Sequence, residues 1–223
     1  MSNFFFTVFI SLLVFNFKNY DSVEISKKSD IDSTIISYDT TTISSEQYKA
    51  FVTADYKMYV VNSKGDTVFK KPDSYVDFVF TDFNTDGFND ILIHRISNVP
   101  GIQELILFDS VKKCFIIVKG FERFPDPKSI QGTKYFFSYH RSGCADNFWD
   151  SDLFSIDNFE THLLGNISGN ECEGNIGIVV SKIVENKKKV FETFKVDTLE
   201  SYNDRKWEFI SDYWKNNYLK FIQ

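Results

Sequence analysis

The sequence lacks an excess of basic residues. Its 223 residues include 25 Lys and Arg against 31 Asp and Glu, which gives a formal net charge of −6 at pH 7. Nucleic-acid-binding domains carry a basic patch that neutralises phosphates, so the composition predicts no nucleic-acid partner. The acidic balance also argues against attraction to an anionic membrane surface.

The sequence also lacks the short motifs of common catalytic sites. It contains no G-x-S-x-G, no H-E-x-x-H and no glycine-rich phosphate loop. The segment His140–Cys144 places a thiol near an imidazole, but it offers neither a helix-borne nucleophile nor a second pair of metal ligands. We therefore expect a protein that acts by binding and is not an enzyme.

No apolar run is long enough for a typical membrane span. The longest, residues 4–17, would form a helix of about 21 Å, whereas the hydrocarbon core of a bilayer is about 30 Å thick. Residues 1–19 are therefore predicted to be a signal peptide, followed by a polar linker over residues 20–54. This predicts an extracytoplasmic protein, periplasmic or secreted, whose mature chain has no stable membrane insertion. The alternatives are an uncleaved N-terminal anchor and a buried first helix.

Cysteine is scarce, with three residues in the chain. Cys144 and Cys172 lie in glycine-containing loop sequences, RSGCADN and SGNECEGN, where two thiols can approach without disturbing a sheet. Export would permit a disulfide between them. Cys114 lies in the strand-like CFIIV and is expected to stay free. Three free cysteines are the alternative.

Aromatic residues are abundant, at 17% of the chain with 25 Phe. Short β-rich runs alternate with turn residues, as in ELILFDSVKKCFIIV, and predict a series of hairpins. The fold class is therefore all-β, an antiparallel propeller-like or sandwich domain over residues 55–200. In residues 201–223, apolar residues recur at spacings of three and four, which predicts a C-terminal amphipathic helix packed on the β domain.

The segment TDFNTDGFND, residues 81–90, has the spacing of a calcium-binding loop. Calcium prefers six to eight oxygen ligands on a loop that curls around it, with a glycine at the sharp turn. The predicted ligands are Asp82, Asn84, Asp86, the carbonyl of Phe88, and Asp90. Gly87 supplies the turn. The EF-hand's glutamate is absent, which predicts a strand–loop–strand site of modest affinity, on the order of 10⁻⁴ M. The alternative is an Asp- and Asn-rich surface turn.

In its setting, VFTDFNTDGFNDILI, this loop resembles the calcium hairpins of FG-GAP and VCBS-type β-propeller repeats. More narrowly, residues 55–180 resemble a bacterial family of periplasmic propeller-like proteins. The resemblance implies a protein partner, because the best understood members are immunity proteins that block lysozyme-like, peptidoglycan-cleaving effectors. An inhibitor of a cell-wall hydrolase is therefore the expected function. The alternative is an extracytoplasmic glycan-binding or glycan-degrading module.

The segment YHRSGCADNFW, residues 139–149, combines residue types that are enriched at binding hot spots. Tyr139, Arg141 and Trp149 are the predicted partner-binding residues, on the expectation that they are exposed. The alternative is a structural loop whose Trp149 fills the core.

Overall fold

Residues 35–71 form a four-stranded antiparallel sheet in the computed structural model, which describes residues 34–174 and 176–222. The strands pair in chain order: β1 (Ile35–Ile43), β2 (Glu46–Thr53), β3 (Met58–Asn62) and β4 (Thr67–Lys71). The predicted polar linker is therefore wrong for residues 35–53. Threonine and isoleucine favour strands, and the alternate residues Tyr38, Thr40 and Thr42 form the exposed face of β1. The predicted signal peptide and the linker up to residue 33 lie outside the described residues.

A second antiparallel sheet follows with the same chain-order pairing. Its strands are β5 (Phe78–Thr81), β6 (Asp90–His94), β7 (Gln103–Asp109) and β8 (Cys114–Ile117). The predicted hairpin in ELILFDSVKKCFIIV is confirmed as β7 and β8, with Asp109 opposite Cys114. Cys114 is free, as predicted.

The third sheet has the order β15-β14-β13-β12-β10-β9, and β11 also pairs with β12. Its strands are β9 (Lys128–Ser129), β10 (Tyr135–Phe137), β11 (His140–Gly143), β12 (Phe148–Asp157), β13 (Glu160–Asn170), β14 (Gly177–Val184) and β15 (Lys187–Phe194). The long hairpin of β12 and β13 turns directly after Asp157.

The C-terminal helix is confirmed as α1 (Arg205–Asn217). Short 3-10 helices stand elsewhere in the chain: η1 (Phe121–Arg123), η2 (Cys144–Asp146), η3 (Val196–Ser201) and η4 (Tyr218–Phe221). Of the predicted apolar stripe, Ile210 and Trp214 are buried, whereas Trp207 is 37% exposed. The indole N–H of Trp214 donates to the Ser151 hydroxyl at 2.8 Å, which fastens the helix to β12.

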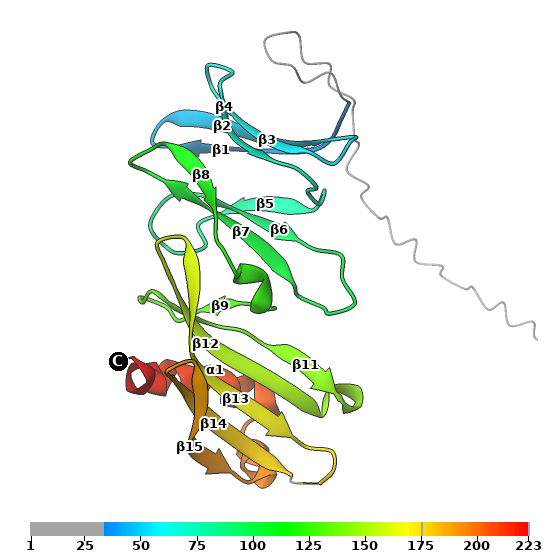
Figure 1. The fold of residues 1–223 in the computed structure, drawn as a ribbon, viewed down its shortest axis with the longest axis vertical. Helices are drawn as coiled ribbons and strands as arrows, with labels where there is room; N and C mark the ends of the chain where they lie inside the picture. The colour runs from blue at the N-terminus through cyan, green and yellow to red at the C-terminus, as the bar shows by residue number, and fades with distance from the viewer. Residues whose placement is uncertain (1–33, 175, 223) are drawn as a thin grey trace, which may run out of the picture.

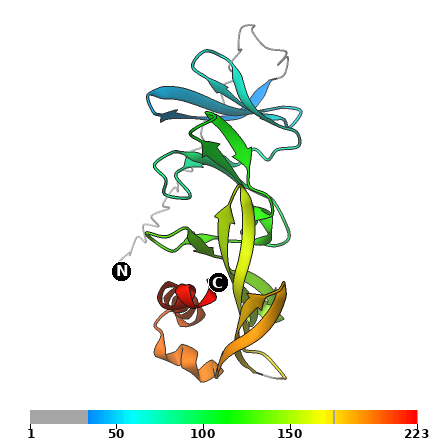
Figure 2. The same ribbon diagram turned by 60° about the vertical axis from the view of Figure 1, so that its left-hand side comes forward.

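The three sheets are stacked along the long axis of the molecule, and α1 lies beside the third (Figures 1 and 2). Buried apolar residues fall into three clusters: one between the first and second sheets, one between the second and third, and one between the third sheet and α1. The all-β prediction with a C-terminal helix is therefore confirmed. The described residues form no closed barrel, and the layered arrangement fits a sandwich.

Candidate functional site

Residues 82–90, which we call the aspartate loop, run from the end of β5 to the first residue of β6. The Asp82 carboxylate accepts hydrogen bonds from the backbone N–H groups of Asp86 and Gly87, both at 3.0 Å. The Asp86 carboxylate accepts one from the N–H of Phe88 at 2.9 Å. Gly87 has a φ of +89°, a conformation that favours glycine. The loop therefore curls around its own carboxylates.

Asp90 is fully buried and has no cationic partner among the described residues. Its two oxygens accept hydrogen bonds from the backbone N–H groups of Phe83 (3.1 Å) and Phe108 (2.9 Å). Burial raises the pKa of Asp90 to about 7, against the lowering effect of these hydrogen bonds, and the nearby charge of Asp86 adds to the rise. A buried carboxyl with this environment favours either a proton or a bound cation.

The donors in the aspartate loop have the right chemistry for calcium. Carboxylate, amide and backbone carbonyl oxygens are the ligands that this ion prefers. Within residues 34–174 and 176–222, no three Asp, Glu, His or Cys side chains are gathered so that they alone could hold a metal ion. A calcium site here would therefore need the Asn84 amide oxygen and the Phe88 carbonyl in addition to the carboxylates.

The aspartate loop also joins the three sheets. Phe83 stacks on Phe136 of the third sheet, with ring centroids 5.1 Å apart. Phe88, five residues later, packs in the cluster between the first and second sheets. The amide of Asn89 donates to the Thr41 hydroxyl of β1 at 2.7 Å. A change in this loop would therefore reach both intersheet cores.

Residues 141–147, which we call the disulfide loop, protrude where β11 turns into β12. The predicted disulfide between Cys144 and Cys172 is confirmed, with a Cα–Cα distance of 6.5 Å, and ties this loop to the segment after β13. Cys144, Ala145 and Asp146 have φ values of 48°, 50° and 75°. Three successive non-glycine residues in the left-handed region are costly and persist only when the surrounding contacts impose them.

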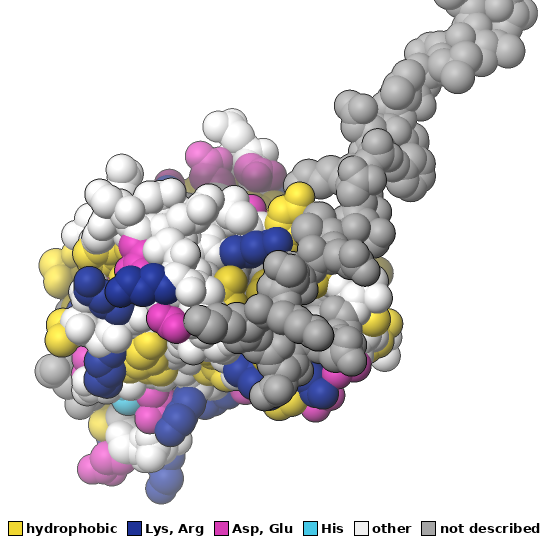
Figure 3. Space-filling view, turned by 90° about the horizontal axis from the view of Figure 1, so that it is seen from above, with side chains coloured by type: hydrophobic (Ala, Val, Ile, Leu, Met, Phe, Trp, Pro, Cys, Tyr) yellow, Lys and Arg dark blue, Asp and Glu magenta, His cyan; other side chains and the backbone are white. Residues whose placement is uncertain are grey.

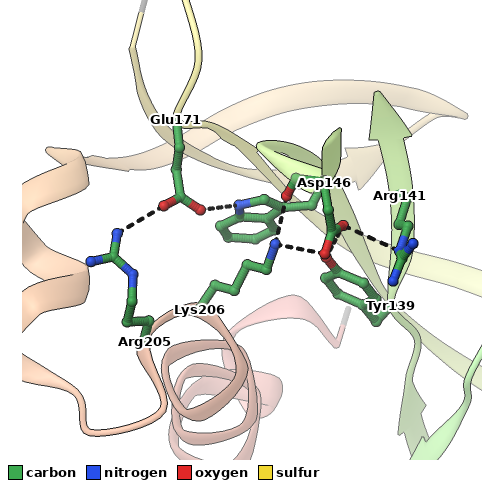
Figure 4. A network of polar contacts seen from close by, with 7 residues as sticks. Tyr139, Arg141, Asp146, Glu171, Arg205 and Lys206 are labelled. Carbon is green, nitrogen blue, oxygen red and sulfur yellow. Dashed lines mark hydrogen bonds and ion pairs between the residues drawn. The ribbon is translucent and has the colours of Figure 1, made fainter. Parts of the chain in front are cut away.

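Those contacts converge on Asp146, as Figure 4 shows. Its carboxylate accepts a hydrogen bond from the Tyr139 hydroxyl (2.6 Å) and forms ion pairs with Lys206 Nζ (3.0 Å) and Arg141 Nε (3.6 Å). Burial acts to raise the pKa of Asp146, but the hydrogen bonds from Tyr139 and Lys206 outweigh it and hold this pKa below its ordinary value. Burial and the bond to Asp146 raise the pKa of Tyr139 in turn. The carboxylate is therefore ionised and firmly held.

Glu171 anchors the other side of the disulfide loop. It accepts a hydrogen bond from the Trp149 indole N–H at 2.8 Å and pairs with Arg205 at 3.0 Å. Asp146 and Glu171 thus both receive side chains from the first turn of α1 (Figure 4). Sequence reasoning missed this clamp, because its members are up to 60 residues apart and no local spacing connects them.

Two of the three predicted partner-binding residues are not exposed. Trp149 is fully buried and Tyr139 is 7% exposed, so the expectation of exposure is wrong for both. Strand alternation turns Trp149 toward α1, and Gly169 on β13 leaves room for its ring. The alternative prediction, that Trp149 fills the core, is the arrangement observed. Arg141 is exposed, with 60% of its side chain accessible.

No helix among the described residues is both long and apolar enough to span a membrane. Disulfides persist in oxidising compartments, so the bridge between Cys144 and Cys172 indicates an extracytoplasmic protein.

Comparisons with known proteins give weak structural likeness alone. No protein family model and no curated protein matches the chain. Among solved structures, it is similar to a Xanthomonas type IV secretion system related protein at 12% identity. The TM-score is 0.48, and the match covers 70% of this chain and 93% of that one. A likeness of this degree supports no statement about activity, and the resemblance to the calcium-hairpin family stays a prediction.

Proposed function

We propose that this protein is exported and inhibits a peptidoglycan hydrolase by placing the disulfide loop in the cleft of the enzyme. It would act by binding and not by catalysis. The observation that carries the proposal is the run of left-handed residues from Cys144 to Asp146 in an exposed loop. Strained backbone of this kind concentrates at functional sites.

Rigidity is the property that an inhibitory loop needs. A loop already fixed in its bound conformation loses little conformational entropy on binding, which raises affinity without new contacts. Here the disulfide loop is fixed by three kinds of contact: the disulfide, the ion pairs of Asp146, and packing against the buried side chains of Tyr139 and Trp149. In this revised assignment Tyr139 and Trp149 are supports, and Arg141 is the residue that would contact the partner.

Charge provides a second reason. Hydrolases that act on an anionic cell wall are often cationic, and the net charge of −6 would steer this protein toward such a partner. The sequence resemblance to immunity proteins against lysozyme-like effectors agrees with the same reading. A periplasmic location would place the protein where such effectors act.

Calcium bound in the aspartate loop would stabilise the scaffold. The ion would be held by Asp82, Asn84, Asp86, the carbonyl of Phe88, and Asp90, and would supply the positive charge that these carboxylates lack. Its role would be structural, because Phe83 and Phe88 connect this loop to both intersheet cores.

Turbidity clearing of purified peptidoglycan by the hydrolase encoded beside or co-purified with this protein tests the proposal. We expect clearing to stop near a one-to-one ratio. Arg141→Ala should weaken binding at least thirtyfold, about 2 kcal/mol for a hot-spot residue. Arg123→Ala, which removes an exposed arginine outside the disulfide loop, is the matched control. Undiminished clearing at molar excess would end the inhibitor proposal, and retention on peptidoglycan would then favour the glycan-binding alternative.

A further inference from the structure

The strand β15 is the free edge of the seven-stranded sheet, opposite the edge that carries the disulfide loop (Figures 1 and 2). It pairs with β14 along its whole length, and seven of its eight residues are exposed. Within the described residues no backbone hydrogen bond joins its outer side to another element. An edge strand of this length is a template for pairing with another chain.

The hairpin of β14 and β15 has a net positive charge, opposite in sign to that of the whole chain. Residues 177–195 contain five lysines and two glutamates, in a protein whose net charge is −6. Lys188 donates a hydrogen bond to the Asn166 side chain at 2.9 Å. The other four lysines have no ion-pair partner among the described residues: Lys182, Lys187, Lys189 and Lys195. By contrast, Lys71, Lys206 and Arg205 are paired with acidic side chains.

Charges on the opposite end of the molecule are distributed differently. Figure 3 looks onto the end formed by the first sheet, and basic side chains there are interspersed with acidic and uncharged ones. The charge pattern of the lysine-rich edge is therefore not repeated at this end of the molecule.

Apolar groups accompany the lysines. Val190 is 68% exposed and Phe191 is 39% exposed, and the ammonium of Lys182 lies 4.5 Å from the ring centroid of Phe191. A shallow depression of about 480 Å³ lies on the hairpin of β14 and β15, lined by residues that include Val179 and Thr193. An anionic surface would bind through the lysine charges alone. An extended peptide would use the backbone edge of β15, the lysines and these apolar side chains together.

We propose that β15 binds an extended acidic segment of a protein partner by adding it to the sheet as a further strand. A second copy of this chain is a poor occupant, because it would bring two lysine-rich strands together and like charges on paired strands are destabilising. An acidic strand instead places carboxylates against Lys187 and Lys189 while its backbone pairs with β15. This surface is separate from the disulfide loop, so the two could be occupied at the same time.

A ten-residue peptide of alternating glutamate and valine is the probe, with amide hydrogen exchange and binding measured on the full chain. We expect exchange of outward amides of β15 to slow at least tenfold. The double variant Lys187→Glu, Lys189→Glu should weaken binding at least tenfold. The variant Lys64→Glu, Lys134→Glu makes the same charge change at exposed lysines in other hairpins and should bind as the unaltered protein does.

Two further arms decide between strand addition and simple charge attraction. A peptide with N-methyl groups at alternate residues keeps its charge but cannot complete the ladder, and should bind at least tenfold more weakly. Vesicles containing phosphatidylglycerol test an anionic lipid surface. Equal binding of the methylated peptide, binding to vesicles alone, or no slowing of exchange in β15 would each overturn the proposal.

Discussion

The aspartate loop and the disulfide loop are both acidic turns between strands, but they neutralise their carboxylates in different ways. In the disulfide loop, Asp146 receives two cationic side chains and its pKa is lowered. In the aspartate loop, Asp90 receives only backbone N–H groups, and burial raises its pKa to about 7. One loop is electrostatically complete within the chain. The other is the loop in which we propose that a calcium ion binds.

The largest expected effect tests this difference through pH. Without calcium, the folded state keeps a proton on Asp90 up to about pH 7, whereas the unfolded state releases it near pH 4. Between these values the folded state binds more protons, so the free energy of unfolding falls as pH rises, by about 4 kcal/mol at 1.36 kcal/mol per pKa unit. Urea unfolding with a chelator, from pH 4 to pH 8, measures the slope.

The variant Asp90→Asn should flatten this part of the pH profile. Asp109→Asn is the control, because the pKa of Asp109 is shifted in the opposite direction: hydrogen bonds from the backbone N–H groups of Lys112 and Val111 lower it. Replacing Asp109 should lower the free energy of unfolding only at pH values where its carboxyl is ionised in the folded state. Equal slopes for the unaltered protein and Asp90→Asn would show that Asp90 does not behave as a buried acid.

Removal of the disulfide is expected to have the next largest effect. The bridge closes a loop with a sequence separation of 28 residues, which contributes about 3–4 kcal/mol in the chain-entropy model. The double variant Cys144→Ser, Cys172→Ser should lose this amount in denaturant unfolding, and Cys114→Ser is its control. If the two serine variants are equally stable, the left-handed run is imposed by the Asp146 contacts alone.

We expect calcium to stabilise the folded state by binding to the aspartate loop and to no other part of the chain. At a hundredfold excess over its dissociation constant, an ion that binds only the folded state adds about 2.7 kcal/mol. Differential scanning fluorimetry in chelator and in about 10 mM calcium, which is a hundredfold excess over a dissociation constant of about 10⁻⁴ M, would detect the rise in melting temperature, and Asp86→Ala should abolish it. Asp109→Ala removes a turn carboxylate from the next hairpin and should leave the calcium response intact. An unchanged melting temperature of the unaltered protein would refute the calcium site.

The smallest expected effect is that of Tyr139→Phe. It removes the hydroxyl that donates to Asp146, and a hydrogen bond to a charged group contributes about 1.5–3 kcal/mol. The remaining ion pairs of Asp146 with Lys206 and Arg141 should keep the loss near the lower end. Tyr38→Phe, at an exposed tyrosine, is the control. A loss no larger than that of the control would mean that the ion pairs suffice to hold the loop.

The same contrast explains what the sequence could predict. The aspartate loop is made by residues 82–90 binding their own backbone, so its spacing is visible in the sequence. The disulfide was also predictable, because two of three cysteines lie in loop sequences. The clamp on Asp146 was not, since Lys206 comes from the far end of the chain. Exposure of Tyr139 and Trp149 was misjudged because it depends on which face α1 covers.

The first two strands were missed for a different reason. Residues 35–53 carry many hydroxyl and charged side chains, which resemble a linker in composition. Their apolar residues, among them Tyr48 and Val52, are nevertheless buried against the second sheet. A strand in the outermost sheet of a stack is buried on one face only, so it can contain many polar residues. Composition alone therefore could not distinguish these strands from a linker.

The stacking of the sheets has a consequence for cooperativity. Each sheet packs on its neighbours through a separate core, as in a short array of repeats, and the stability of such arrays depends on the interfaces between adjacent units. The aspartate loop is common to both intersheet interfaces, through Phe88 on one side and Phe83 on the other. A bound cation would therefore couple the unfolding of the layers into one transition. Its removal would let them separate in steps, with a van't Hoff enthalpy smaller than the calorimetric one.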